Sequence, residues 1–456
     1  MYCADTIVAC STPAGRGAIA IVRCSGPRAL AVAESVFRPK FPGPPEPWRM
    51  RIGTVVAADG ATPVDEALGV FFPGPHSFSG EDTFEIHCHG SPVVVEQVVA
   101  SAMAAGARAA ERGEFTRRAV LNGKLDLLQA EAVADLIDAK MAAGASAAWR
   151  QLQGALSEEF AGIRTALLAL LADIEAALDF TDDELPDADF GRRCDALDMV
   201  DSRLEGLLLG FAASRRQRDG LRVVFTGKPN AGKSSLVNRL LGSGRMIVSD
   251  EPGTTRDVVE EAVDLGGIAF VLTDTAGIRE AAGAAEIQAV ERARASVAEA
   301  DLRVLVIDAS LPPAPEDDIW TDIVGPDTIV VLNKTDLAVS SPREWRARLA
   351  TGFTALLETS ARTGEGCSAL ADALVAAARG RIEADPVGIS RVRHRAALER
   401  AIGPLRRARR LAESEATSEL AATEIRSVLA ELAAISAPVD NEEVLDLIFS
   451  EFCIGK

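Results

Sequence analysis

The residue types best suited to chemistry in this sequence form a glycine-rich loop. Its pattern is G-x-x-x-x-G-K-[ST], and it reads Gly227-Lys228-Pro229-Asn230-Ala231-Gly232-Lys233-Ser234. The two glycines allow backbone N–H groups to approach phosphate oxygens, Lys233 is expected to reach the β- and γ-phosphates, and the Ser234 hydroxyl is expected to bind Mg²⁺. A chance glycine turn is the alternative. Because an apolar strand is expected at 221–226 and a helix at 235–241, the sequence predicts a nucleoside triphosphate site.

Three later motifs have the chemistry to recognise Mg²⁺ and guanine. Asp274-Thr275-Ala276-Gly277 is expected to place Asp274 in the Mg²⁺ shell and the Gly277 amide near the γ-phosphate. In Asn333-Lys334-Thr335-Asp336, the Asp336 carboxylate can accept from N1–H and the exocyclic amine of guanine, and Asn333 can meet the other edge. Adenine lacks that donor pair, and such sites reject analogues by about 10⁴-fold. With Thr359-Ser360-Ala361 as a base-side loop, this order of motifs predicts a GTPase.

The segment between the phosphate loop and Asp274 predicts a switch region. Within Gly253-Thr254-Thr255-Arg256-Asp257, Thr255 is expected to give Mg²⁺ a second hydroxyl. Ile278 stands where signalling GTPases carry a water-orienting Gln, so hydrolysis must recruit another group. A monovalent cation near the loop is one hypothesis, with oxygens available from Asn230, Ser249, Glu251 and Thr254. From the residues alone, Glu286 is more simply a solvated helix carboxylate than a general base.

Composition limits the kinds of function that are open to the chain. With 456 residues it can form two to four domains, and its formal net charge of −19 disfavours a general binder of polyanions. A partner is therefore expected to hold most of any nucleic acid. Seven scattered cysteines without a C-x-x-C pair and the absence of a signal peptide or membrane-length apolar run predict a cytoplasmic location.

The pattern of apolar residues divides the chain into four parts. Residues 1–118 predict a small α+β domain with strands near 6–9, 18–23, 67–72 and 83–87. Residues 119–215 predict helices, including one long helix whose buried face is Leu152, Leu156, Phe160, Ile163, Leu167, Leu170, Ile174 and Leu178. Residues 216–383 predict an α/β domain with a mainly parallel sheet, and residues 384–456 are helical again. The expected fold is thus multidomain, α+β and α/β, with a nucleotide-binding domain inserted into one helical domain.

Several of these segments together resemble the MnmE (TrmE) family of tRNA modification GTPases, over essentially the entire chain. Besides the phosphate loop and Gly253-Thr254-Thr255-Arg256-Asp257, the resemblance rests on Asp5-Thr6-Ile7-Val8-Ala9, Pro13-Ala14-Gly15-Arg16-Gly17, Ser77-Phe78-Ser79-Gly80-Glu81-Asp82, His89-Gly90, Gly113-Glu114-Phe115-Thr116, Leu121-Asn122-Gly123-Lys124-Leu125-Asp126 and Cys453-Ile454-Gly455-Lys456.

The resemblance implies an architecture and an activity. The family has an N-terminal α+β domain that binds folate and forms a homodimer, a discontinuous helical domain and an inserted Ras-like P-loop GTPase domain. With the flavin-dependent partner MnmG, it forms 5-carboxymethylaminomethyl or aminomethyl uridine at the tRNA wobble position, using a one-carbon unit from 5,10-methylene- or 5-formyl-tetrahydrofolate. Its GTP hydrolysis is stimulated by K⁺ and coupled to dimerisation of the inserted domains.

The resemblance also assigns roles to residues of this chain. It places K⁺ on Asn230, Ser249, Glu251 and Thr254, Mg²⁺ on Ser234 and Thr255, and folate on Arg23, Glu85, Lys124 and Lys456. Glu286 becomes the group that orients the attacking water, with Lys233 and Cys453 as further catalytic candidates. The remaining residues assigned to the nucleotide and cations are Ala231, Gly232, Ser235, Asp250, Pro252, Gly253, Asp274, Thr275, Ala276, Gly277, Asn333, Lys334, Asp336, Thr359, Ser360 and Ala361.

Some interpretations stay open at this point. Cys453 is either a thiol that acts near the folate or an inert free cysteine. Arg362 stands where the family often has Lys, and its side chain is expected to matter little because the backbone of this loop binds the base. A ribosome-assembly or signalling GTPase is the rival function, but it would not need the Arg23, Glu85 and Lys124 set. A scaffold with a vestigial nucleotide site is disfavoured because the phosphate-loop and base-recognition residues are all present.

Overall fold

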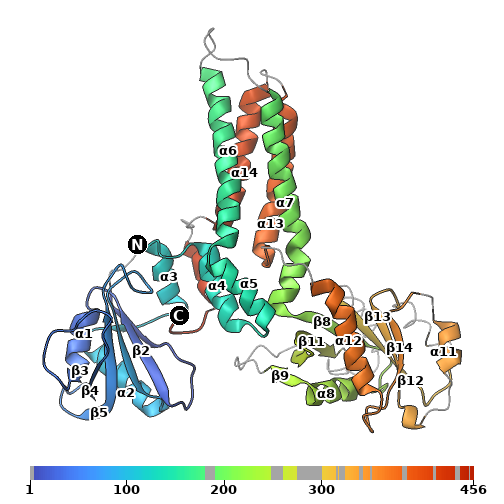
Figure 1. The fold of residues 1–456 in the computed structure, drawn as a ribbon, viewed down its shortest axis with the longest axis horizontal. Helices are drawn as coiled ribbons and strands as arrows, with labels where there is room; N and C mark the ends of the chain where they lie inside the picture. The colour runs from blue at the N-terminus through green and yellow to red at the C-terminus, as the bar shows by residue number, and fades with distance from the viewer. Residues whose placement is uncertain are drawn as a thin grey trace. The chain divides into compact units, whose positions relative to one another are not determined.

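The computed structural model describes residues 5–179, 190–247, 260–274, 300–314, 317, 324–337, 342–349, 352–382, 388–413, 417–436, 442–450 and 452–456. The chain forms two compact units. The first contains Met1–Ala134, Gln151–Arg203 and Ala396–Lys456, and the second contains Asp135–Arg150 and Leu204–Arg395. Figure 1 shows the sheets and helices of both. The expected mixture of α+β and α/β architecture is confirmed, whereas the domain boundaries at 118, 215 and 383 stay predictions.

The first unit begins with a seven-stranded, mainly antiparallel sheet of order β3-β4-β5-β6-β2-β1-β7. Its strands are β1 (Ile7–Cys10), β2 (Ile19–Ser25), β3 (Phe37–Pro39), β4 (Arg51–Val56), β5 (Pro63–Phe72), β6 (Thr83–His89) and β7 (Arg108–Ala109). Helices α1 (Ala29–Val36) and α2 (Pro92–Ala104) cover one face, where they share a buried core with Val22 and Ile86. The four predicted strands are confirmed; β3, β4 and β7 are additions, and the predicted α+β character gave no bounds for α1 and α2.

Alternation along β2 and β6 decides which side chains face away from that core. Arg23 lies directly opposite Glu85, and Ile21 lies opposite His87. Because successive residues of a strand point to opposite faces, Arg23, Glu85 and His87 share the face that the helices leave uncovered. Cys88 points the other way and is buried, as the alternation of a strand predicts. A polar site is thereby fixed to the outer face of a rigid sheet.

Helices from both ends of the chain build the rest of the first unit and part of the second. They are α3 (Glu114–Leu121), α4 (Leu127–Asp138), α5 (Ala142–Leu152), α6 (Ala155–Asp179), α7 (Phe190–Asp219), α13 (Val392–Leu411), α14 (Ser418–Ser436) and α15 (Glu442–Ser450). Helices α6 and α14 lie side by side (Figure 1). The predicted buried face of the long helix is confirmed from Leu156 to Ile174. Leu152 is an exception, since α5 ends there and Gly154, with φ +95°, separates it from α6.

The second unit contains a seven-stranded sheet of order β14-β13-β12-β8-β11-β10-β9. Its strands are β8 (Leu221–Thr226), β9 (Arg245–Ile247), β10 (Glu260–Leu265), β11 (Ile268–Asp274), β12 (Leu302–Asp308), β13 (Thr328–Asn333) and β14 (Ala355–Glu358). Five are parallel, and β10 and β9 add antiparallel pairs at one edge. Helices α8 (Lys233–Ser243) and α12 (Cys367–Ile382) pack on one face, and Trp345 of α11 (Pro342–Arg348) packs on the other.

The predicted nucleotide motifs follow the carboxyl ends of these parallel strands. Strands β8, β11, β12, β13 and β14 end at Thr226, Asp274, Asp308, Asn333 and Glu358. Carboxyl ends of parallel strands meet at one edge of a sheet, where open α/β folds bind their ligands. The predicted mainly parallel sheet is confirmed, and it gathers motifs spread over more than a hundred residues.

Candidate functional site

The phosphate loop is pressed tightly against the sheet edge. Gly227 has φ +135° and Gly232 has φ +97°, a region of backbone conformation that favours glycine. A Cβ on Gly227 would lie 2.2 Å from the carbonyl oxygen of Val306, and one on Gly232 would lie 2.2 Å from Nδ2 of Asn333. Asn230 also has a positive φ of 62°, which asparagine tolerates better than most residues. The backbone of the loop is therefore fixed before any anion arrives.

Lys233 is the buried cation of this loop. It begins α8, its residue is 5% exposed, and its Nζ donates to the carbonyl oxygens of Gly227 (2.8 Å) and Lys228 (2.9 Å). Ser234 and Ser235 follow in the first turn of α8 and are exposed. A helix N-terminus, a curled backbone and an ammonium group held among carbonyl oxygens together suit a polyphosphate.

Asn333 ties the base-side loop to the phosphate loop. It is 1% exposed; its Nδ2 donates to the carbonyl of Ala231 (2.8 Å), and its Oδ1 accepts from the amide of Ala361 (3.0 Å) and the Thr359 hydroxyl (3.3 Å). Most of its hydrogen-bonding capacity is thus used within the protein, leaving one N–H of the amide for a base. The sequence prediction of Asn333 as a base contact did not include this bracing role.

The Asp336 carboxylate contacts Ser360, in the predicted base-side loop, and Arg362, just after that loop. Ser360 donates to Oδ1 (2.6 Å), and the Arg362 guanidinium is 2.7 Å from Oδ2. The hydrogen bond from Ser360 is the main cause that lowers the pKa of Asp336; burial opposes it, and the charge of Arg362 adds to the lowering. The carboxylate is consequently held ionised. The Arg362 side chain, expected to matter little, lies at the predicted base-recognition group and is 74% exposed.

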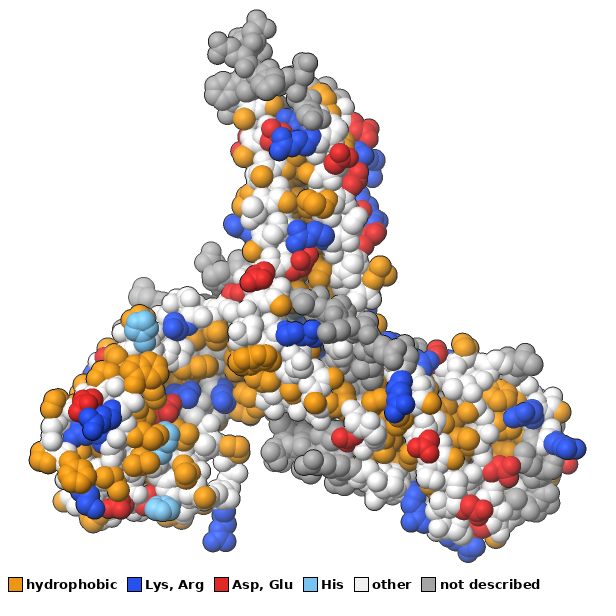
Figure 2. Space-filling view, viewed as in Figure 1, with side chains coloured by type: hydrophobic (Ala, Val, Ile, Leu, Met, Phe, Trp, Pro, Cys, Tyr) orange, Lys and Arg blue, Asp and Glu red, His pale blue; other side chains and the backbone are white. Residues whose placement is uncertain are grey.

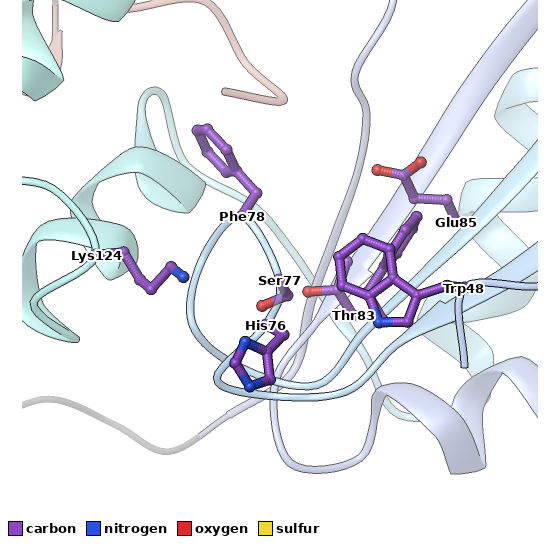
Figure 3. A pocket seen from close by; sticks show the side chains of 8 residues that line it. Trp48, His76, Ser77, Phe78, Thr83, Glu85 and Lys124 are labelled. Atoms are coloured by element: carbon purple, nitrogen blue, oxygen red, sulfur yellow. The ribbon is translucent and has the colours of Figure 1, made fainter. Parts of the chain in front are cut away.

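A second candidate site lies in the first unit, whereas the nucleotide motifs belong to the second. A pocket of about 450 Å³ is lined by Trp48, Phe72, His76, Ser77, Phe78, Thr83, Glu85 and Lys124. Figure 3 shows Lys124 and Phe78 on one side of it, and Trp48 and Glu85 on the other. Two of the four predicted folate residues, Glu85 and Lys124, therefore line one cavity, which combines aromatic rings with one anionic and one cationic group.

Arg23 and His87 hold the Glu85 carboxylate at this pocket. The Arg23 Nε is 2.8 Å from Oε1 of Glu85, and the His87 Nε2 is 3.2 Å from Oε2. Burial raises the pKa of Glu85, but the hydrogen bonds and charges of His87 and Arg23 outweigh it, so the net pKa is lowered. The Arg23 guanidinium also lies over the rings of Phe78 and Phe115, at 5.2 and 5.6 Å from their centroids.

The carboxyl-terminal residues of the chain reach the same network. Ile454 forms an antiparallel bridge with Arg112, and the Phe115 amide donates to the Lys456 carbonyl (3.0 Å). Burial and the charge of Arg23 lower the pKa of Lys456, opposed by Cys453 and Glu85. The structure thus brings Lys456 near Arg23 and Glu85 although more than 370 residues separate them. Cys453 lies in the same tail as an exposed free thiol.

Comparisons with known proteins identify the family of the chain. A family model described as the GTP-binding protein TrmE N-terminus matches residues 6–124, and one described as the MnmE helical domain matches residues 127–453. A tRNA modification GTPase MnmE from Heliobacterium modesticaldum is 40% identical to this chain, and the alignment covers 99% of each protein. The chain belongs to the MnmE family. An MnmE from Chloroflexus aurantiacus is 43% identical over 99% of this chain and 100% of its own length.

One solved structure matches part of this MnmE family member. The G domain of the T. maritima FeoB iron transporter is 27% identical, covering 35% of this chain and 98% of that one, with a TM-score of 0.27. The family assignment does not depend on this likeness. The N-terminal family model includes Arg23, Glu85 and Lys124, and the helical-domain match ends at Cys453.

Several residues that the family implies lie outside the described part of the structure. They are Ser249, Asp250, Glu251, Pro252, Gly253, Thr254, Thr255, Thr275, Ala276, Gly277 and Glu286. Asp274 closes β11 with its backbone opposite Phe225 of β8, one residue before the end of that strand. Its predicted place at the phosphate edge of the sheet is consistent with this register, whereas its role toward Mg²⁺ stays a prediction.

The sequence did not predict the aromatic lining of the N-terminal pocket. Trp48, Phe72 and Phe78 come from segments separated by 24 and 6 residues, and only their packing in the sheet brings them together. Phe78 lies in a motif that carried the family resemblance, which is the one signal that could have indicated it. Trp48 lies in a proline-rich turn where no local pattern indicates a binding site.

Proposed function

We propose that this chain is a GTPase whose cycle drives modification of tRNA wobble uridines at C5, giving 5-carboxymethylaminomethyl or aminomethyl uridine. A flavin-dependent partner of the MnmG type and a tetrahydrofolate one-carbon unit complete the reaction. The observation that carries this proposal is the full-length likeness to MnmE proteins in a chain that holds both a phosphate loop and a separate polar, aromatic pocket. The acidic chain, with a formal net charge of −19, relies on the partner for most contacts to the tRNA.

In the nucleotide site, recognition and charge neutralisation fall to different residues. Asp336 accepts from the N1–H and amine of guanine in place of its contact with Arg362, and Asn333 donates its remaining N–H to the purine ring. Lys233 and the amides of the phosphate loop neutralise the β- and γ-phosphates. The Ser234 hydroxyl, exposed at the start of α8, suits a Mg²⁺ ligand, with Thr255 as its second hydroxyl and Asp274 in its shell.

Hydrolysis requires a substitute for the missing glutamine. Ile278 cannot orient water, so Glu286 takes that role. Asn230, Ser249, Glu251 and Thr254 would hold K⁺, which would supply positive charge near the phosphates. The left-handed backbone of Asn230 supports a specialised position within the loop. GTP turnover is expected to fall when K⁺ is replaced by Na⁺ at constant ionic strength. Equal rates in the two salts would exclude the cation site while leaving GTP recognition untouched.

The N-terminal pocket fits a reduced folate by its chemistry. Glu85 suits the donor edge of a pterin, and Arg23, Lys124 and Lys456 suit carbonyl or carboxylate oxygens. When bound, a 5,10-methylene- or 5-formyl-tetrahydrofolate would supply the one-carbon unit. Cys453, exposed in the tail that also carries Lys456, is the thiol placed to act near it. A Cys453→Ser variant that kept full modification activity would assign this cysteine an inert role.

The outer face of the N-terminal sheet suits a homodimer contact. Ile19 is 63% exposed and Leu68 is 38% exposed, and both lie on the face that α1 and α2 leave uncovered. Hydrophobic side chains gather on this part of the molecule in the view of Figure 2. Exposed apolar side chains on one face are typical of a protein contact. A dimer mass in light scattering that Ile19→Lys converts to a monomer mass would support this assignment.

The decisive experiment is mass spectrometry of wobble nucleosides from cells that lack the protein. We expect the C5-modified uridines to disappear and to return with the wild-type chain but not with Lys233→Ala. Unchanged wobble uridines, together with altered ribosome profiles, would instead support a ribosome-assembly GTPase. No helix among the described residues has the length and apolar character to span a bilayer.

A further inference from the structure

Trp48 is a pocket residue to which the family resemblance assigns no role. It lines the N-terminal pocket together with Glu85 and Lys124, yet its residue is 60% exposed. Exposure of a single aromatic side chain is common on protein surfaces, so it is the place of Trp48 in the pocket lining that suggests a role. Figure 3 shows Trp48 on the same side of the pocket as the anionic Glu85, with the cationic Lys124 on the other side.

The chain holds this ring in place through an unusual backbone conformation. Trp48 has φ +63°, a left-handed value that bulky residues rarely adopt. Its amide donates to the Phe71 carbonyl (2.9 Å), and Pro47 forms a bridge with Phe71. Its ring meets Phe72 edge to face, with centroids 4.9 Å apart and planes at 82°. Edge-on contact with Phe72 leaves a flat face of the indole open, because the partner ring stands nearly perpendicular to it.

We infer that Trp48 supplies the stacking surface for a planar nitrogen heterocycle in this pocket and so contributes to its selectivity. The heterocycle presents N–H donors to Glu85 and an anionic or carbonyl group to Lys124. This inference rests on the proposed function, which places the pterin of a reduced folate here. Trp48 contacts the flat face of the heterocycle, whereas Glu85 accepts hydrogen bonds from the N–H groups at its edge.

The matched variants follow from the backbone of Trp48. Trp48→Phe keeps a smaller ring, and Trp48→Asn removes the ring while providing a residue that tolerates positive φ. Trp149→Phe is the control, because Trp149 is similarly exposed (53%) but lies in the second unit, outside this pocket. All variants are tested in the full chain, with 5-formyltetrahydrofolate as the probe.

Two measurements distinguish a stacking role of Trp48 from folate binding in general. Calorimetry measures the Kd of 5-formyltetrahydrofolate, and quenching of tryptophan fluorescence reports a ring in contact with the indole. We expect wild type and Trp149→Phe to bind equally, with strong quenching in both. Trp48→Phe is expected to lose most of the quenching and bind a few-fold more weakly, and Trp48→Asn to bind about 10- to 100-fold more weakly, the range of aromatic stacking on a base.

Each other outcome has a definite meaning. No binding by wild type would overturn the folate part of the proposed function. Wild-type binding with an unchanged Kd in Trp48→Asn, or quenching that survives in Trp48→Phe, would overturn the role of Trp48 alone. Melting temperature and light-scattering mass are measured on every variant, and a loss of binding that followed a loss of dimer mass would assign Trp48 to the subunit contact instead.

Discussion

Replacement of Asp336 by asparagine tests guanine recognition at its chemical centre. In the wild type, Ser360 donates to Oδ1 of Asp336, so an amide at this position keeps its oxygen there and places Nδ2 where Oδ2 was. That Nδ2 would face the N–H groups of guanine, giving donor against donor. Xanthine carries a 2-oxo group in place of the amine and can accept from Nδ2. Asp336→Asn is therefore expected to exchange a preference for GTP for a preference for XTP.

The size of the effect follows from the bonds that are lost. Two hydrogen bonds to a carboxylate contribute about 1.5–3 kcal/mol each, so losing both costs about 3–6 kcal/mol. At about 1.4 kcal/mol per tenfold, GTP affinity should fall by roughly 10²- to 10⁴-fold. XTP should gain affinity by roughly tenfold or more, because a neutral hydrogen bond from Nδ2 to the 2-oxo group replaces two acceptors, the 2-oxo group and the carboxylate, that face each other in the wild type. Arg362, exposed and paired only through Oδ2, adds little to this difference.

The assay is the kcat/KM of the full chain for GTP and XTP, measured in K⁺ and Mg²⁺ with equal nucleotide ranges. Asp327→Asn is the matched control, since Asp327 pairs with Arg381 at the opposite edge of the same sheet. We expect that control to keep the wild-type preference. A variant at Asp336 that stayed within threefold of wild type on GTP, or that folded normally and failed to gain XTP, would refute the assignment.

Three further predictions concern stability and the carboxyl-terminal tail. Glu85→Gln should lower the free energy of unfolding by about 2 kcal/mol at pH 7. The folded-state pKa of Glu85 is lowered from 4.5, so the difference in unfolding free energy between wild type and variant should vanish as the pH falls through that lowered value, as measured by denaturation at several pH values. Gly455→Ala would place a Cβ 2.0 Å from the Cys10 carbonyl and should weaken 5-formyltetrahydrofolate binding in calorimetry; Gly60→Ala, with positive φ but open space, should not. Asn333→Ala leaves buried partners unpaired and should reduce stability by about 2–4 kcal/mol, seen in chemical denaturation, and abolish nucleotide binding.

Several strands of the nucleotide-binding sheet could be predicted because their signals are local. The run 221–226 became β8 with the predicted bounds, and the polar motifs begin at or just after the carboxyl ends of their strands, whereas β9, β10 and β12 were not predicted. Spacing along the chain could not show how Asn333 is used. Its hydrogen bonds to Ala231 and Ala361 join residues that are 102 and 28 positions away along the chain, which no local pattern encodes.

The N-terminal unit could be predicted less well, for reasons visible in particular segments. Helix α2 begins with three consecutive valines after Pro92, a composition that favours strands, yet Val98 and Ala102 pack a helix against the sheet core. Tertiary packing overrides propensity there. The break between α5 and α6 needed only the left-handed backbone at Gly154, which an apolar period of threes and fours does not reveal.

The placement of Lys456 depends on the last helix rather than on the tail itself. Leu445, Ile448, Phe449 and Phe452 bury their side chains against Val120, Leu127, Ala130 and Ala134, so α15 is fixed on α3 and α4. The tail then has few residues in which to turn, and the positive φ of Gly455 lets it pass against Cys10. A charged side chain at the end of a protein chain, such as that of Lys456, is usually poorly ordered. Here helix α15, which ends at Ser450, holds the tail in place, so the proposed folate site should respond to changes in the helical segments as well as in the sheet.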